Sequence, residues 1–214
     1  SFFAYYPWNN LSNGSLGIGI ENIEDASKMC VRVNVKNTPS EQIDFMLSDL
    51  IKDKTYQDTN NEGKVSFVFH HILSLVNIKL IIDNEMKSIA KLNVNSASIS
   101  GLYNAGTCHP SYDQSSTKTA FTWTPYFKTG TSTQQYALDA SSISSTSSSQ
   151  TGNILLIVPQ QLNTNVIFTI NYDIIFIDSN GNEKYRYTNN EENVVLKNSG
   201  NITEWLSGKR YNYT

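Results

Sequence analysis

Hydrophobic and polar residues alternate with a period of two along most of the chain. In residues 29–35, Met29, Val31, Val33 and Val35 fall on one face and polar side chains on the other. This period is typical of a strand that buries one face. The same reasoning predicts strands at residues 1–8, 29–35, 65–69, 75–82, 96–103, 120–123, 136–138, 153–158, 166–177 and 183–187.

Polar and glycine-rich segments separate these predicted strands. The sharpest is residues 178–181, Asp-Ser-Asn-Gly, because an Asn-Gly pair between two strands is typical of a tight hairpin. Residues 9–19 form a turn-rich stretch, residues 58–63 indicate a linker, and the Ser-rich residues 141–150 indicate an exposed loop. Many strands joined by polar turns predict an all-β fold made of β-sandwiches.

One segment has helical spacing instead. In residues 40–54 the apolar residues Ile43, Leu47, Leu50 and Ile51 recur at intervals typical of a helix, with the apolar stripe facing the core. The sequence therefore predicts at most one or two short helices, the main one in this segment.

The composition narrows the class of protein. Of the 214 residues only 16% are charged, the net charge is −3, and Asn, Ser and Thr make up about a third. Such a chain disfavours long surface helices, while twelve Tyr and nine Phe favour strands. Without a strongly cationic composition, nucleic acid and an anionic membrane are disfavoured as main partners. An exported protein is indicated, and no apolar run reaches the ~20 residues that span a bilayer.

Candidate metal ligands are few. The cysteines are Cys30 and Cys108, and the histidines are His70, His71 and His109. A chelate from the adjacent Cys108 and His109 is disfavoured because neighbours on a strand point to opposite faces. We expect the cysteines to form a disulfide or to remain buried free thiols. We expect His70 and His71, with apolar neighbours, to be packed and to donate to backbone carbonyls, so no metal or cofactor is predicted.

Other catalytic motifs are absent from the sequence. Residues 14–19 are rich in glycine but lack the strand-then-helix setting of a phosphate loop, and no G-x-S-x-G elbow marks a nucleophile. The acidic residues in 21–25 and 191–192 lack the spacing of a calcium loop, so we expect a solvated surface there. The sequence predicts a protein that is not an enzyme and has no catalytic residues.

Five short motifs resemble the Bacteroidales fimbrillin family, the fimbrillin-like subunits of type V pili. They are F-A-Y-Y-P at 3–7, V-S-F-V-F-H-H-I-L-S at 65–74, I-S-G-L-Y with a later G-T at 99–107, L-L-I-V-P-Q at 155–160, and W-L-S-G-K-R-Y-N-Y-T at 205–214. In the second motif, His71 matches the family histidine. Five motifs in the right order and spacing make the resemblance specific.

The resemblance implies a fold and a role. The fold would be two transthyretin-like β-sandwiches in tandem, the remainder of an N-terminal one in residues 1–63 and a C-terminal one in residues 64–214. The role would be that of a fimbrial subunit or adhesin, exported as a lipoprotein and held at the outer membrane by an upstream lipid anchor. Cys30 is internal and is not the lipidation site. The partners would be other pilus subunits, joined by strand exchange, and host or bacterial surface ligands.

Both ends depart from the family pattern, since residues are expected before Ser1 and a further strand after Thr214. With the chain opening on an aromatic strand, we predict a sandwich with an incomplete edge that accepts a strand. The alternative is a surface module that binds carbohydrate or host ligands without polymerising, with Trp8, Trp123 and Tyr126 stacking on sugars. A binding module would close its edges. A glycan-cleaving enzyme is disfavoured because no paired acids are evident.

Overall fold

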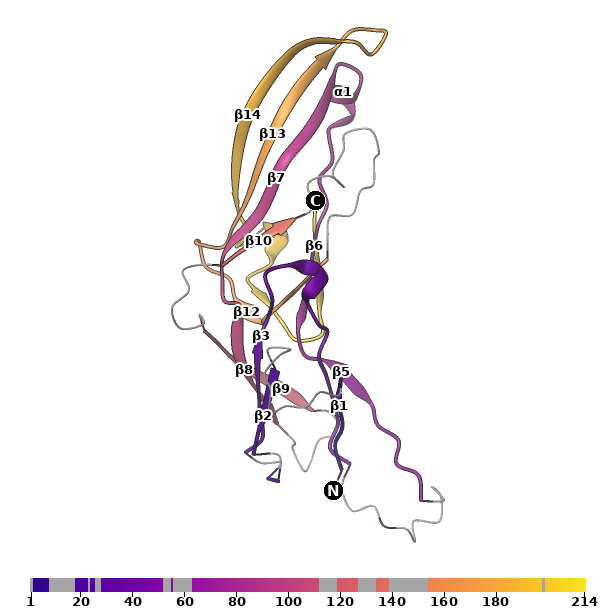
Figure 1. Ribbon diagram of the computed structural model, residues 1–214, viewed down its shortest axis with the longest axis vertical. Coiled ribbons are helices and arrows are strands. Elements are labelled where there is room, and N and C mark those ends of the chain that lie inside the picture. Colours follow the sequence, from indigo (N-terminus) through magenta and orange to yellow (C-terminus); the bar gives the residue numbers. More distant parts are fainter. Residues whose placement is uncertain are drawn as a thin grey trace.

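Strands make up most of the described chain, as the period-two pattern predicts. The computed structural model describes residues 2–7, 18–22, 24–25, 28–51, 55, 63–111, 119–126, 134–138, 154–197 and 199–214, with backbone alone for 134–138. The molecule is elongated, with the N-terminus at one end of the long axis and the β13–β14 hairpin at the other (Figure 1). The predicted all-β fold is confirmed.

The longest strands form one antiparallel sheet in the order β10-β7-β13-β14. They are β7 (Ala90–Leu102), β10 (Gln134–Leu138), β13 (Ile167–Ile177) and β14 (Glu183–Val195). The ends of β7, β13 and β14 rise together beyond the rest of the molecule as an arm (Figure 1). The predicted hairpin turn joins β13 to β14, and Gly181 there has a φ of 81°.

A three-stranded sheet, β11-β6-β16, lies at the base of the arm. It contains β6 (Ser74–Ile78), β11 (Leu155–Ile157) and β16 (Arg210–Tyr213), which runs parallel to β6. The short strands β12 (Gln160–Gln161) and β15 (Glu204–Trp205) pair with each other beside it.

Two sheets form the lower half of the molecule. One has the order β1-β4-β5, with β1 (Tyr5–Tyr6), β4 (Met46–Ser48) and β5 (Phe69–His71). The other has the order β2-β3-β8-β9, with β2 (Ile18–Glu21), β3 (Cys30–Asn34), β8 (Ala105–Ser111) and β9 (Ala120–Tyr126). Strands from both sides of residue 63 pair within these sheets, and the division of the chain at that residue stays a prediction.

One continuous apolar core runs through both halves. Its largest fully buried side chains come from all parts of the described sequence: Met29, Val31, Phe45, Leu47, Ile72, Val76, Ile99, Leu102, Leu155, Ile157 and Trp205. A shared core of this kind fixes the two halves relative to each other. Among the described residues, no helix is long and apolar enough to cross a membrane.

The helix predicted for residues 40–54 is wrong. The segment begins with a 3-10 turn at Pro39–Glu41 and continues into β4. Phe45 and Leu47 are the fully buried side chains, with the spacing of two that a strand requires, and Ile51 pairs with Phe2. The one α-helix in the described part is α1 (Asn84–Lys87), whose first turn is capped by Asp83.

The other strand predictions succeed unevenly. The sequence pattern missed β2 and β8. It also predicted β7 and β14 shorter than they are, since β7 begins at Ala90 and β14 ends at Val195. Almost every residue of β14 is exposed, so no apolar alternation marks its second half. Of the predicted first strand only Tyr5 and Tyr6 are strand residues, with Trp8 outside the described residues. The predicted loop at 141–150 also lies outside the described residues.

Candidate functional site

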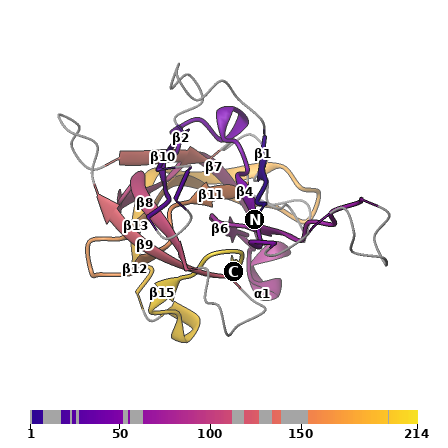
Figure 2. The same cartoon turned by 90° about the horizontal axis from the view of Figure 1, so that it is seen from below.

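Strand β1 lies at a sheet edge and carries no charged side chain. It ends the sheet order β1-β4-β5, so within the described part only one of its sides is paired (Figure 2). The Phe2 and Ala4 backbones face β4, since Phe2 exchanges two 2.8 Å bonds with Ile51 and the Ala4 carbonyl accepts from Ser48 at 2.8 Å. Because backbone groups alternate along a strand, those of Phe3 and Tyr5 point away from β4.

Three other sheet edges, β9, β11 and β14, carry features that disfavour the addition of a strand. Edge strands commonly avoid adding a further strand by means of charges, prolines or covering groups. In β9 there is a proline, Pro125, and on β11 the Leu156 N–H donates to the side chain of Gln42 at 2.7 Å. Five charged side chains lie along β14: Glu183, Lys184, Arg186, Glu191 and Glu192. In contrast, residues 2–6 are Phe-Phe-Ala-Tyr-Tyr.

Ser48 holds β1 against β4. Its side chain is fully buried; its Oγ accepts the N–H of Ala4 at 2.7 Å and donates to the Asp49 carbonyl at 2.9 Å. Tyr5 stacks on the buried ring of Phe45 with 6.1 Å between centroids. These contacts fix the direction of β1, and no strand of the described residues pairs with its outer side.

Asp49, next to Ser48, joins three elements of the lower half. One carboxylate oxygen accepts from the Thr119 hydroxyl at 2.6 Å and the Thr119 N–H at 3.2 Å, and lies 3.0 Å from His70 Nε2. Burial acts to raise the pKa of Asp49, but the Thr119 and His70 hydrogen bonds outweigh it and hold that pKa below its ordinary value. Asp49 thus ties the end of β4 to β5 and to the start of β9.

The prediction that His70 and His71 donate to backbone carbonyls is wrong, because their partners are carboxylates. His70 bonds the Asp49 carboxylate and packs on Phe121, and His71 Nδ1 lies 2.6 Å from Asp44 Oδ2. Among the described residues, each imidazole therefore has a carboxylate partner where a backbone carbonyl was expected. Their acidic partners come from more than twenty residues earlier, which the apolar neighbours of the histidines did not reveal. Across the described ranges, no three His, Cys, Asp or Glu side chains gather where they could hold a metal ion.

We expect Asp49→Asn to lower the free energy of unfolding at pH 7 by about 1–2 kcal/mol, because a charged hydrogen-bond acceptor is lost. The lowered pKa means that this contribution is present above about pH 4, the unfolded value, and is lost as the pH falls through the folded value. Urea unfolding of both proteins at several pH values measures it. The difference should shrink below pH 4, and the exposed Glu24→Gln control should change little. A difference that does not depend on pH would contradict this reasoning.

Both cysteines are buried free thiols. Val31 lies directly opposite Cys108, so Cys30, one residue earlier on β3, points to the other face of the sheet. Burial raises the pKa of each thiol, so neither is a reactive nucleophile. Of the two alternatives the sequence left open, the structure has the free thiols.

The remaining candidates from the sequence lie apart from one another. Trp123 is half-buried and its indole N–H donates to Ser207 at 2.8 Å, while Tyr126, three residues on, is exposed. In the acidic segment 21–25, Glu21 pairs with Arg32 and Asp25 with Lys28 at the surface. These contacts are those of a solvated face and an edge-capping indole.

Four of the sequence motifs meet at the middle of the molecule. The side-chain amide of Gln160 bonds both backbone groups of Tyr103, at 3.0 and 3.1 Å. Ser74 donates to the Leu206 carbonyl at 2.9 Å, and the Gly208 N–H donates to the Leu73 carbonyl at 3.0 Å. The motif residues thus join the lower sheets to the base of the arm.

Comparisons with known proteins agree with this architecture. A fimbrial protein from Bacteroides vulgatus has a similar solved structure, with a TM-score of 0.65 and 19% identity over 99% of this chain and 71% of that one. A Bacteroides uniformis protein assigned to cell adhesion is similar with a TM-score of 0.52 and 18% identity, over 98% of this chain and 65% of that one. A comparison with curated protein sequences finds no match.

The family assignment rests on the sequence itself. A sequence model described as fimbrillin-like matches residues 1–214, the whole of the chain. This confirms both the family resemblance carried by the five motifs and the prediction of a structural protein that is not an enzyme. The chain belongs to the fimbrillin-like family.

Proposed function

We propose that this chain is a cell-surface fimbrial subunit that accepts a strand from a neighbouring subunit at the free edge of β1. The observation that carries the proposal is the uncharged edge at residues 2–6, with the backbone groups of Phe3 and Tyr5 pointing away from β4. Membership of the fimbrillin-like family and the fold shared with fimbrial and adhesion proteins support it.

An added strand would satisfy this edge in two ways. It would bond the N–H and C=O groups of Phe3 and Tyr5, which cost about 1–3 kcal/mol each when buried without a partner. Its alternate side chains would cover Tyr6, whose side chain is 55% exposed. A contact built from backbone bonds and apolar cover is persistent and nearly independent of salt, unlike an association steered by charge.

The wider proposal follows the motif resemblance. It includes transthyretin-like sandwiches divided near residue 63, and a lipid anchor that displays the protein at the outer membrane. The alternative of a carbohydrate-binding module has less support, because the Trp123 indole is held by Ser207 at a sheet edge.

Phe3→Pro tests the proposed edge. Proline removes the outward N–H of residue 3 but leaves the bonds of Phe2 and Ala4 to their partners in place. Phe3→Ala is the matched control, since it shortens the side chain and keeps the N–H. We expect the proline variant to weaken assembly about tenfold relative to the alanine variant, the equivalent of one lost hydrogen bond at each contact. Light scattering and electron microscopy measure assembly.

Hydrogen exchange provides the second measurement. In assembled wild-type protein the Phe3 and Tyr5 amides should exchange more slowly than in the monomer, while the Ala4 amide changes little because Ser48 already accepts it. Equal assembly of the proline and alanine variants, or unprotected Phe3 and Tyr5 amides in the assembled protein, would contradict strand addition at β1. Circular dichroism and thermal unfolding check that both variants fold.

A further inference from the structure

The arm contains two β-bulges at the same level, one on each side of β13. The pairing of β7 with β13 shifts between Asn171 and Tyr172, which leaves Asn95 as an extra residue on β7. The pairing of β14 with β13 shifts between Tyr172 and Ile174, where β14 has one residue more than β13. Asn189 lies in that shift and has a φ of 57°, in the left-handed region.

The pairing at the two ends of this stretch requires extra residues on β14 but does not place them. On the side away from the turn, Tyr172 lies opposite Asn190. At the turn, the Asp178 N–H donates to the Asn182 carbonyl at 2.9 Å. Between these two pairs β14 has two residues more than β13, one in the bulge at Asn189 and one in a second shift close to the turn. With both ends unchanged, the extra residue at the bulge can also be accommodated nearer the turn.

Burial of apolar side chains does not decide between these two places. A slip of one residue moves each side chain beyond it to the opposite face of the sheet, and such a slip is strongly opposed only where one face is buried. Every residue of β14 from Glu183 to Asn189 is exposed, and Tyr185 and Tyr187 are 71% and 61% exposed. Little apolar area is therefore gained or lost when the tyrosines change face.

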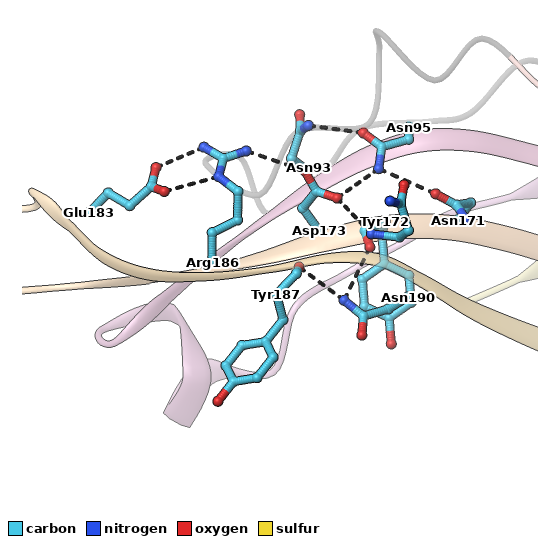
Figure 3. Close-up of polar contacts among 10 residues, drawn as sticks. Asn93, Asn95, Asn171, Tyr172, Asp173, Glu183, Arg186, Tyr187 and Asn190 are labelled. Atoms are coloured by element: carbon cyan, nitrogen blue, oxygen red, sulfur yellow. Dashed lines mark hydrogen bonds and ion pairs between the residues drawn. The ribbon is translucent and has the colours of Figure 1, made fainter.

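Asp173, a buried residue, contacts both bulges through its carboxylate. Its Oδ1 accepts from the Asn95 side chain at 2.9 Å and from the Asn189 N–H at 3.1 Å (Figure 3). Its Oδ2 accepts from Arg186 at 3.2 Å, and Arg186 also bonds Glu183 through two nitrogens. The hydrogen bonds from Asn95 and Asn189 hold the pKa of Asp173 below its ordinary value, so the carboxylate is charged at neutral pH. We call these five residues the polar cluster.

The place of the bulge on β14 decides which way the tyrosines point. Tyr187 lies opposite Ile174 and Tyr185 opposite Phe176, so these side chains share the apolar face of the sheet. The rings of Tyr187 and Phe176 meet edge-on with 6.0 Å between centroids, and Figure 3 shows Tyr187 pointing away from the polar cluster. If the extra residue lay nearer the turn, Thr188 would be opposite Ile174, and both tyrosines would lie on the polar face.

We propose that the arm can pair in two registers that differ by one residue beyond the bulges, and that the Asp173 carboxylate selects the register with Tyr185 and Tyr187 on the apolar face. The bulged register takes the Asn189 N–H out of the backbone ladder and holds Asn189 in a left-handed conformation, and both features are unfavourable. Asp173 offsets them by accepting that N–H and by bonding the extra residue of β7, Asn95. In the second register Asn189 takes an ordinary place opposite Asp173. This choice of register does not depend on strand addition at β1.

Asp173→Ala tests the selection, and nuclear Overhauser contacts between backbone protons measure the register. The bulged register gives contacts from Ile174 to Tyr187, whereas the second register gives contacts from Ile174 to Thr188. We expect the population of the second register, relative to the bulged one, to rise at least about tenfold in the variant, because the Asn95 and Asn189 donors lose a charged acceptor.

Two further variants separate the choice of register from a general loss of stability. Thr169→Ala is the matched control: Thr169 lies on the same strand and its hydroxyl donates across to the Asn193 side chain at 2.6 Å, at a level without a bulge. It should lower stability and leave the register unchanged. Asn189→Gly, added to Asp173→Ala, should restore the bulged register, since glycine adopts a positive φ without strain.

Three outcomes would overturn the proposal. They are unchanged contacts between Ile174 and Tyr187 in folded Asp173→Ala, the same change of register in Thr169→Ala, and no return of these contacts when Asn189 becomes glycine. Circular dichroism checks that each variant folds. If Asp173→Ala does not fold, Asp173→Asn takes its place with the same outcomes, because the amide keeps one oxygen that accepts from Asn95 or Asn189 and loses the charge.

Discussion

Replacing Gly101 with alanine is expected to prevent the chain from folding stably. Gly101 lies near the end of β7 with a φ of +77°, and a Cβ there would be 1.9 Å from the Asn165 carbonyl oxygen and 2.5 Å from its carbon. The left-handed backbone alone costs about 1–2 kcal/mol for a residue with a side chain. The clash adds to this because it is with backbone, and the turn at residue 165 must move away from β7. We expect a total loss above about 4 kcal/mol.

Gly181→Ala is the matched control for this variant. Its φ is +81°, but a Cβ there would meet nothing within 4 Å. It should therefore lose about 1–2 kcal/mol, the cost of backbone strain alone. Urea unfolding followed by circular dichroism measures both variants. Equal losses at the two glycines would show that close packing between β7 and the turn at residue 165 is not what requires Gly101.

Local patterns predicted the parts of the fold that local chemistry decides. The hairpin between β13 and β14 follows from the Asn-Gly turn and from long flanking strands, all close in sequence. The spacing of apolar residues in 40–54 fits a helix equally well as a strand over so short a span. Pairing of β4 with β1 and β5 decided the outcome, and such distant pairing is not visible in a single segment.

The candidate site shows the same limit. The sequence marked the aromatic segment at residues 2–6, but that it forms a sheet edge depends on which strands pair with β4. The acidic partners of His70 and His71 were hidden for the same reason, since Asp49 and Asp44 approach them only through the β4–β5 pairing. The bulges of the arm also escaped prediction, because Asn95, Asp173 and Asn189 come from three strands.

Trp205→Ala should cause the largest loss among single side chains. Trp205 is the largest fully buried residue in the described part of the chain, with 1% of its surface exposed, and it lies on β15 opposite Gln160. Its indole N–H donates to the Tyr213 hydroxyl at 3.0 Å, and this bond anchors the last strand, β16. Truncating a buried tryptophan costs about 3–5 kcal/mol and leaves the buried Tyr213 hydroxyl without its donor.

Leu206→Ala is the control that tests whether burial of the side chain, and not its place in the motif at 205–214, determines the loss. Leu206 follows Trp205 directly but its side chain is exposed, so its loss should change the free energy of unfolding by less than about 0.5 kcal/mol. Tyr213→Phe removes the hydroxyl alone and should cost about 1 kcal/mol, because the indole N–H then lacks its acceptor. If Trp205→Ala lowers the free energy of unfolding no more than Tyr213→Phe does, packing of the indole ring is not what holds β15 and β16 together. A large loss for Trp205→Ala with a small loss for Tyr213→Phe would show that packing of the indole ring, more than its hydrogen bond, stabilises β15 and β16.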